Sequence, residues 1–426
     1  MKKLDIVAYL LALCHGGEAA PIRQTLNLEV VCNVEAGILD SPDPAVRFEV
    51  SLTNLQSTPV EAELTLKFNT VAIKTGLGDQ SHSINLGPNE KRAVEFTYLH
   101  DSPGFVELQA EAALKATGKI LKQRRRVGFQ PEAIKAPLSR SQDFESFWQH
   151  SLEELRKIDP QFQTTPVKDQ PNTYEVSMKS LGNITVRGWL EIPPFLENAR
   201  DCPVVIRFPG YGNQVRPTRK SYPWVVFSFN PRAHGNSQDE IKSKPVNYWL
   251  RGLDRKEDYF YRGAFLDCVR ALDYVASLKN IDPDRIAVIG TSQGGGLALA
   301  TAALDPRVDF CAPDIPFLCD WKNYFQLSHW PEMQQWIEAE PNRSWGTTLN
   351  TMSYFDTLNF ADRIACPVFM GVGLQDGICP PTTNFSVYHR IKGKKEYRLY
   401  PEKGHGLGQE HREATEKWLK SQFGVE

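Results

Sequence analysis

Residues 285–299 read R-I-A-V-I-G-T-S-Q-G-G-G-L-A-L, and this stretch decides the fold. It begins with an apolar, β-branched run at 286–289, which is typical of a strand buried on both faces of a parallel sheet. Residues 290–294 then spell G-x-S-x-G, and the small apolar segment 297–304 predicts a helix. A strand, a tight turn and a helix are the context in which G-x-S-x-G forms a nucleophile elbow, so Ser292 is the candidate nucleophile.

The segments around this elbow alternate between strands and helices. Apolar runs at 204–208, 225–229 and 367–374 predict further buried strands, and 397–400 is expected to form the last strand. Residues 261–278 and 409–423 predict helices. Such alternation is typical of a doubly wound, mostly parallel sheet. We therefore expect an α/β-hydrolase fold over residues 139–426, with its chemistry at the carboxyl ends of the strands.

Two loops at predicted strand ends supply partners for Ser292. In α/β-hydrolases the nucleophile is followed along the chain by an acid and then by a histidine. Asp376 lies just past the strand at 367–374, and His405 lies just past the strand at 397–400. The expected roles are attack by Ser292, proton transfer by His405, and orientation of the imidazole by Asp376.

Other acids and histidines are weaker candidates. His389 and His411 are interpreted as surface or packing residues, and His329 lies in an aromatic insertion at 320–350. Asp356 and Asp362 fall in a helical pattern and are interpreted as solvated. The rings of the insertion are expected mostly to pack, with one or two lining a sugar site.

An oxyanion hole needs two backbone N–H groups close to the nucleophile. One belongs to the residue after the nucleophile, here Gln293, and the other to a loop after an earlier strand. The loop Gly210-Tyr211-Gly212 follows the strand at 204–208, so the N–H of Tyr211 is the second candidate.

The first third of the chain has an all-β pattern. Apolar residues alternate with polar ones around 46–52, 64–68, 94–96 and 106–108, with turn signals between them, which predicts an immunoglobulin-like sandwich over 21–130. Residues 131–138 are expected to form a linker, and the basic cluster at 122–126 a solvated strand end. The expected role is a spacer or docking domain; the alternative is a carbohydrate-binding or substrate-gating module.

The composition excludes several classes of protein. The chain has 426 residues, 23% charged residues and a net charge of −2, so no nucleic-acid partner is indicated. Beyond the N-terminal segment, no run approaches the roughly 18 apolar residues of a membrane span. The eight cysteines are scattered without metal-ligand spacing, which predicts neither a zinc site nor a disulfide framework.

The N-terminal segment resembles a secretory signal. Lys2 and Lys3 precede an apolar run at 6–14, and Ala19 and Ala20 are small residues suited to cleavage. Residues 1–20 are therefore predicted to be a signal peptide, and the protein to be periplasmic or extracellular. The alternative is a short N-terminal helix of a cytoplasmic protein.

Several motifs together resemble the acetyl xylan esterase / cephalosporin C deacetylase family of α/β-hydrolases. They are G-T-S-Q-G-G-G at 290–296, G-L-Q-D-G-I-C-P-P at 373–381, P-F-L-C at 316–319, S-Y-F-D at 353–356, G-Y at 210–211, and the helical pattern at 144–155. The resemblance covers roughly the last two thirds of the chain. It implies deacetylation of acetylated sugars or polysaccharides without a metal or organic cofactor. It also implies Ser292, Asp376 and His405 as the triad, with the amides of Tyr211 and Gln293 as the oxyanion hole.

The chain departs from this family in four places. Residues 232–234 read Arg-Ala-His where the family has Arg-Gly-Gln, and Gly406 stands where the family has Glu after the histidine. The segment between Gly235 and Asp254 looks shorter than the insertion that helps to build the family's ring-like oligomer, so a homo-oligomer stays an open expectation. The β-domain in front is extra.

Two other functions stay open. An acyl-CoA thioesterase or acyltransferase also combines a β-sandwich with an α/β-hydrolase, although the D-x-I-C-P-P motif points away from it. A catalytically inactive, carbohydrate-binding protein on a hydrolase fold is the alternative from another class.

Overall fold

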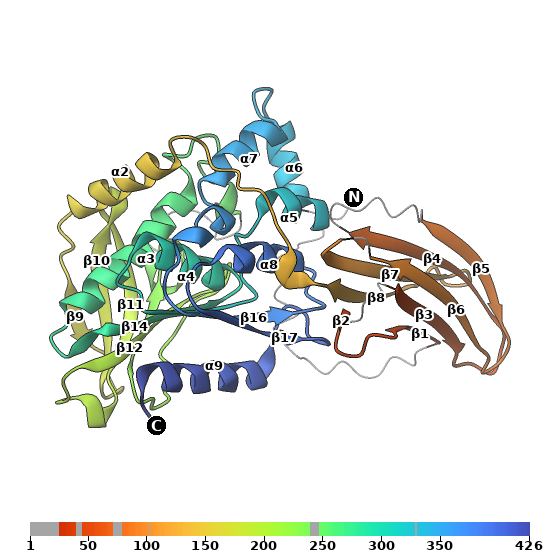
Figure 1. The fold of residues 1–426 in the computed structure, drawn as a ribbon, viewed down its shortest axis with the longest axis horizontal. Helices are drawn as coiled ribbons and strands as arrows, with labels where there is room; N and C mark the ends of the chain where they lie inside the picture. The colour runs from red at the N-terminus through yellow and green to blue at the C-terminus, as the bar shows by residue number, and fades with distance from the viewer. Residues whose placement is uncertain (1–24, 40–44, 71–78, 101, 239–246, 329) are drawn as a thin grey trace.

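The computed structural model describes residues 25–39, 45–70, 79–100, 102–238, 247–328 and 330–426. Within them the chain forms an all-β region followed by an α/β region (Figure 1). The predicted signal peptide at 1–20 and His329 lie outside the described residues. No helix in the described ranges combines the length and apolarity that a membrane crossing requires.

The all-β region consists of two sheets that enclose a separate hydrophobic core. The first sheet has the order β1 (Leu26–Cys32), β3 (Ala45–Asn54), β6 (Lys91–Leu99). The second has the order β2 (Ile38–Leu39), β8 (Ile120–Phe129), β7 (Gly104–Leu114), β4 (Val60–Thr70), β5 (Gln80–Leu86). Val46, Phe48 and Val50 of β3 are buried, as their alternation with polar residues predicts. The all-β character is confirmed, and the immunoglobulin-like topology stays a prediction.

The α/β region is built on one nine-stranded sheet. Its order is β17 (Lys395–Tyr400), β16 (Val368–Gly373), β15 (Phe310–Asp314), β14 (Ile281–Thr291), β12 (Cys202–Phe208), β13 (Val225–Asn230), β11 (Ile184–Glu191), β10 (Thr173–Ser180), β9 (Gln163–Pro166). The strands from β17 to β13 are parallel, and β11, β10 and β9 extend the sheet by antiparallel pairing. This arrangement confirms the predicted α/β-hydrolase fold.

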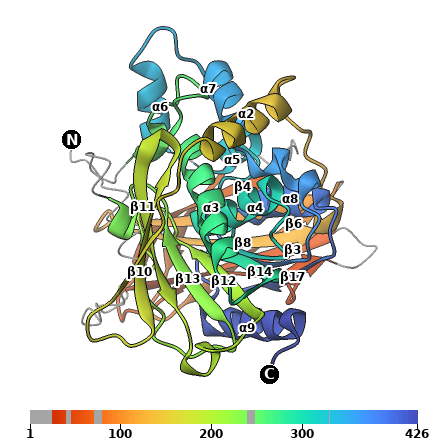
Figure 2. The ribbon, with the colours of Figure 1, turned by 90° about the vertical axis from the view of Figure 1, so that its left-hand side faces the viewer.

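Helices cover both faces of the nine-stranded sheet (Figure 2). One face packs on α9 (Gly408–Phe423), whose Trp418 and Leu419 share a core with strand residues such as Val205 and Ala287. The opposite face carries α2 (Phe144–Arg156), α3 (Phe260–Ser277), α4 (Gln293–Leu304), α5 (Trp321–Leu327), α6 (Pro331–Glu338), α7 (Trp345–Ser353) and α8 (Pro381–Arg390). Central strands such as β14 are therefore buried on both sides, which explains their nearly continuous apolar runs.

The connection between the two regions is packed. Ile134 and Ala136, within the predicted linker, are buried in the core of the α/β region. Trp148 of α2 is fully buried, and its indole N–H donates to the carbonyl of Tyr354 at 2.9 Å. The chain after β8 thus runs along the α/β region in contact with it before the sheet begins.

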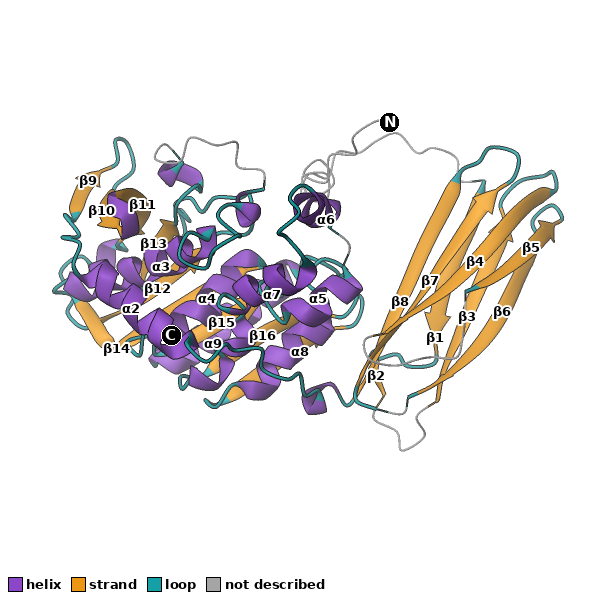
Figure 3. Cartoon of the chain, turned by 90° about the horizontal axis from the view of Figure 1, so that it is seen from above, coloured by secondary structure: helices purple, strands orange, loops and turns teal. Residues whose placement is uncertain are grey.

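The basic cluster at 122–126 differs from its predicted role as a solvated strand end. Lys122 is exposed, but Arg126 is only 6% exposed. Arg124, Arg125 and Arg126 donate hydrogen bonds across to the α/β region. The expectation is confirmed for Lys122 and Arg124, which are exposed, and is wrong for Arg126, because the burial of a charged side chain depends on partners elsewhere in the fold. Figure 3 shows β8 and β2 on the side of the β region that faces the α/β region.

Candidate active site

The turn between β14 and α4 places Ser292 in a strained backbone conformation. Its φ and ψ are 60° and −121°, a combination that costs a residue with a side chain about 1–3 kcal/mol. The flanking glycines allow the turn, because a Cβ on Gly290 would lie 2.4 Å from the carbonyl carbon of Gly294. A Cβ on Gly294 would lie 2.4 Å from the carbonyl oxygen of Phe208. Two backbone hydrogen bonds hold the serine. Its N–H donates to the carbonyl of Asp314, and its carbonyl accepts from the N–H of Phe317, both at 2.9 Å.

Ser292, His405 and Asp376 form one hydrogen-bonded chain. The Nε2 atom of His405 lies 3.1 Å from the hydroxyl oxygen of Ser292, and its Nδ1 atom lies 2.8 Å from Oδ2 of Asp376. A carboxylate can only accept, so Nδ1 carries the proton and Nε2 is free to accept from the serine hydroxyl. The structure thus brings together the three residues that chain order and strand-end position had singled out.

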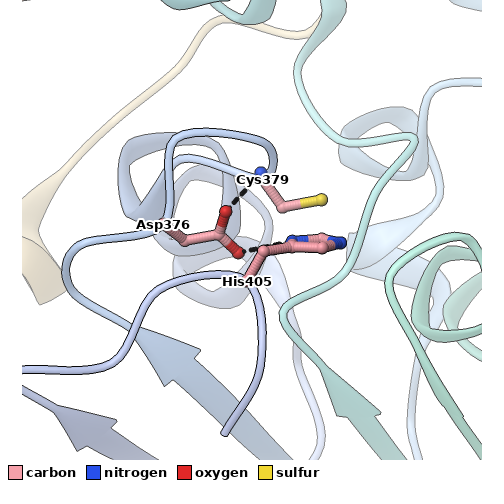
Figure 4. Close-up of side chains that lie close together, drawn as sticks. All are labelled: Asp376, Cys379 and His405. Atoms are coloured by element: carbon pink, nitrogen blue, oxygen red, sulfur yellow. Dashed lines mark hydrogen bonds and ion pairs between the residues drawn. The ribbon is translucent and has the colours of Figure 1, made fainter. Parts of the chain in front are cut away.

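The Asp376 carboxylate is fully buried in a tight turn after β16. Its Oδ1 atom accepts from the backbone N–H groups of Ile378 and Cys379 at 2.8 and 2.9 Å, while Oδ2 faces His405. Figure 4 shows the carboxylate between the amide of Cys379 and the imidazole of His405. Because both oxygens have partners, the orientation of this side chain is fixed before any substrate arrives.

The two candidate oxyanion donors come from the first residue of α4 and from the loop after β12. Gln293 is the first residue of α4, and the first N–H groups of a helix have no intrahelical partner. Tyr211 follows Gly210, where a Cβ would lie 4.0 Å from Cβ of Ser292. The N–H of Gly212, the next residue, donates to the hydroxyl of Tyr248 at 2.9 Å, which fixes the loop.

The side chain of Gln293 lies in a buried polar network that the sequence did not predict. Its carbonyl oxygen accepts from the hydroxyls of Tyr261 and Tyr248 at 2.8 and 3.1 Å. Its amide nitrogen lies 2.9 Å from Nε2 of His234, whose Nδ1 donates to the carbonyl of Arg232 at 2.9 Å. Burial lowers the pKa of His234 to about 4, so the imidazole is neutral at neutral pH. The departure at 232–234 from the family pattern was the signal that could have found this residue.

The weaker candidates have other partners. His411 lies 2.5 Å from a carboxylate oxygen of Asp314 and 3.1 Å from the hydroxyl of Tyr400. These partners are in agreement with its interpretation as a packing residue. Asp356 is 2% exposed, which contradicts its interpretation as solvated. Its carboxylate accepts from the N–H groups of Asp320, Trp321 and Leu358 and so holds the start of α5. Burial, together with the charge of Asp320, raises its pKa to about 7.

Donor atoms of Asp376, Cys379 and His405 lie within 4.8 Å of one another, as metal ligands would. However, the carboxylate and the imidazole are bonded to each other, and burial with the nearby charge of Asp376 holds the pKa of the Cys379 thiol well above its usual value. The sulfur lies 3.9 Å from the hydroxyl oxygen of Ser292. A neutral thiol is a poor metal ligand, so this group fits proton transfer better than metal binding.

The aromatic insertion packs beside the site. Trp321 and Tyr324 of α5 are buried, whereas Trp345 is 36% exposed. Trp330 donates its indole N–H to the hydroxyl of Tyr324 at 2.5 Å, and the hydroxyl of Ser328 donates to the carbonyl of Gly377 in the Asp376 turn at 3.3 Å. Packing explains most of these rings, and a role of one or two in lining a sugar site stays a prediction.

The chain is similar to one known protein family, to a related protein sequence and to solved structures. The sequence model of the family described as Acetyl xylan esterase (AXE1) matches residues 133–422. Acetyl esterase Axe7A of Xylanibacter ruminicola is 32% identical over 343 residues, which cover 75% of each chain. An acetyl xylan esterase from Paenibacillus sp. R4 aligns with a TM-score of 0.63 and 30% identity over 68% of this chain and 98% of that one. Acetyl xylan esterase 1 from Thermoanaerobacterium sp. aligns with a TM-score of 0.62 and 27% identity over 68% and 97%.

Proposed function

The chain belongs to the acetyl xylan esterase family and is a carboxylic ester hydrolase, and we propose that it removes acetyl groups from acetylated carbohydrates through a Ser-His-Asp triad. The observation that carries this proposal is the unbroken hydrogen-bonded chain from Asp376 through His405 to Ser292. The names of the relatives support acetyl esters of sugars as the substrate class.

The first half of the reaction transfers the acetyl group to the enzyme. Nε2 of His405 takes the proton of the Ser292 hydroxyl while the serine oxygen attacks the acetyl carbonyl carbon. The imidazolium that forms is stabilised by Asp376, and it then gives its proton to the departing sugar oxygen. The acetyl group remains bound to Ser292 as an ester.

The second half releases acetate. A water molecule in place of the sugar gives a proton to Nε2 of His405 and attacks the acetyl carbon. The imidazolium then returns that proton to the serine oxygen as its bond to the acetyl carbon breaks, which frees acetate and restores the Ser292 hydroxyl. In both halves the carbonyl oxygen becomes an oxyanion, for which the backbone N–H groups of Gln293 and Tyr211 are the donors. One donor of this kind typically stabilises the transition state by about 3 kcal/mol.

One feature outside the site extends the proposal to the location of the protein. The apolar run at 6–14, which precedes the described residues, supports export by a cleaved signal peptide. N-terminal sequencing of the protein recovered from culture medium or periplasm would find a start near residue 21, whereas a retained Met1 in the cytoplasm would contradict export.

Acetate release from a substrate panel tests the proposed function. The panel contains acetylated xylo-oligosaccharides, acetylated monosaccharides, p-nitrophenyl acetate and acetyl-CoA. Acetyl sugars should be hydrolysed with the highest kcat/KM. A preference for acetyl-CoA would point to a thioesterase or acyltransferase instead. Binding of acetylated sugars without release of acetate would point to a carbohydrate-binding protein.

A further inference from the structure

Strand β8 of the N-terminal β region is hydrogen-bonded to the loops that carry Asp376 and His405. Strand β8 lies next to the carboxyl ends of β16 and β17, where the Asp376 and His405 loops begin (Figure 1). Three successive arginines of this strand, Arg124, Arg125 and Arg126, donate hydrogen bonds to residues of these two loops. The α/β-hydrolase fold alone does not supply these donors.

Arg126 is the central contact. Its Nη1 atom donates to the carbonyls of Leu374 and Asp376 at 2.9 and 2.6 Å, and its Nη2 atom pairs with the carboxylate of Glu107. Arg126 is 6% exposed and Glu107 is 5% exposed. A buried guanidinium keeps its place only when its donors are satisfied, and two of its acceptors here are backbone carbonyls of the Asp376 turn.

Neighbouring residues extend the contact to the whole turn. The side chain of Gln375 pairs with the backbone of Arg126, accepting from its N–H at 2.8 Å and donating to its carbonyl at 3.2 Å. The carbonyl of Gln375 accepts from Arg124 at 2.9 Å. All three carbonyls from Leu374 to Asp376 are therefore bonded to arginines of β8.

The histidine loop is tied to the same strand. Arg125 donates to the carboxylate of Glu402 at 2.6 Å, three residues before His405. The amide of Gln375 also donates to the carbonyl of Pro401 at 2.8 Å, which joins the two loops to each other. Strand β8 thus bonds to the backbone of the Asp376 turn and to the side chain of Glu402 in the histidine loop.

We propose that β8 is a positioning element of the active site, in which Arg126 and Arg124 hold the Asp376 turn so that its carboxylate meets His405. This inference rests on the proposed function, since it assigns the β region a role in the same triad. Displacement of a reacting group by about 1 Å can cost about 100-fold in rate, so loss of these bonds lowers turnover without touching substrate.

The test removes the buried pair as a unit. Deleting Arg126 alone would leave Glu107 charged and buried, whereas replacing both partners by uncharged side chains of similar volume is often tolerated. In Arg126→Met/Glu107→Gln we expect kcat for p-nitrophenyl acetate to fall by about 10-fold to 100-fold while KM changes by less than about 2-fold. The matched control is Arg92→Gln, which breaks an exposed ion pair with Glu90 in the other sheet of the β region.

A spectroscopic measurement separates positioning from general stability. The low-field proton NMR signal of His405 Nδ1–H reports its hydrogen bond with Asp376. It should shift or broaden in the double variant and stay in place in Arg92→Gln. A folded double variant with the kcat and the NMR signal of the wild type would overturn the proposal.

A milder variant covers the case in which the double variant does not fold. Arg124 is exposed, and Arg124→Gln removes only its bond to the carbonyl of Gln375. We expect a kcat about 3-fold below that of Arg92→Gln, and equal values would overturn the proposal. If the wild type hydrolyses no acetyl ester, the proposed function fails, but the NMR comparison still decides whether β8 positions Asp376.

Discussion

Replacement of His234 by glutamine tests the electrostatics of the network behind the elbow. Burial lowers the pKa of His234 from 6.5 to about 4, a difference of about 2.5. Between these values the unfolded chain binds more protons than the folded one, so the free energy of unfolding decreases as pH falls from about 6.5 to about 4. The full difference corresponds to about 3 kcal/mol, of which about 2 kcal/mol is lost by about pH 5.

The assay is urea unfolding of the wild type and His234→Gln at about pH 7 and about pH 5. The wild type should lose about 2 kcal/mol more than the variant between the two conditions, because all other ionisable groups are shared. His150→Gln, on the exposed face of α2, is the control for loss of a surface histidine. Equal pH dependence in the wild type and His234→Gln would refute a neutral, buried imidazole at this position.

Three further predictions concern the elbow and the triad. Asp376→Asn should lower kcat by about 10⁴-fold with an unchanged circular dichroism spectrum, because the amide favours the wrong tautomer of His405; a near-normal kcat would contradict its role. Gly294→Ala should reduce soluble yield and the thermal unfolding temperature, since the new methyl carbon would lie 2.4 Å from the carbonyl oxygen of Phe208; wild-type values of both would contradict the packing of the elbow. Dialysis against a chelator should leave the esterase rate unchanged, since the Asp376 carboxylate is bonded to His405; a loss that added metal restores would contradict this.

The elbow and the sheet were predictable because their signals are local. The apolar run at 286–289 and the G-x-S-x-G motif lie in one short stretch, and each residue acts mainly on its neighbours. Asp376 and His405 could be ranked because parallel strands bring their carboxyl ends to one edge. The structure places His405 beside Ser292 and Asp376 beside His405.

The contacts of charged and polar residues with distant partners could not be predicted. The bond between Arg126 and the carbonyl of Asp376 joins residues 250 positions apart and exists only because the β region docks on the α/β region. The burial of Asp356 could not be predicted, because its three N–H donors come together only in the folded chain. His234 likewise gains its role from the packing of two tyrosines around Gln293.

These misses have a common physical cause. A charged or polar side chain is buried only where the fold supplies its partners, and the identity of those partners is a property of tertiary structure. Apolar periodicity, in contrast, reports burial of a strand or helix face without knowledge of what covers it. The elements and the strand-end loops are therefore predictable from the sequence, whereas the contacts that hold those loops in place are not.

Acetate release by Ser292→Ala is the most direct test of the central claim that Ser292 is the nucleophile of an acetyl esterase. Wild type and variant are compared at equal concentration on acetylated xylo-oligosaccharides, with circular dichroism to show that both are folded. The wild type should release acetate, and the variant should be slower by a factor on the order of 10⁶. Equal rates of acetate release by the two proteins would contradict the account.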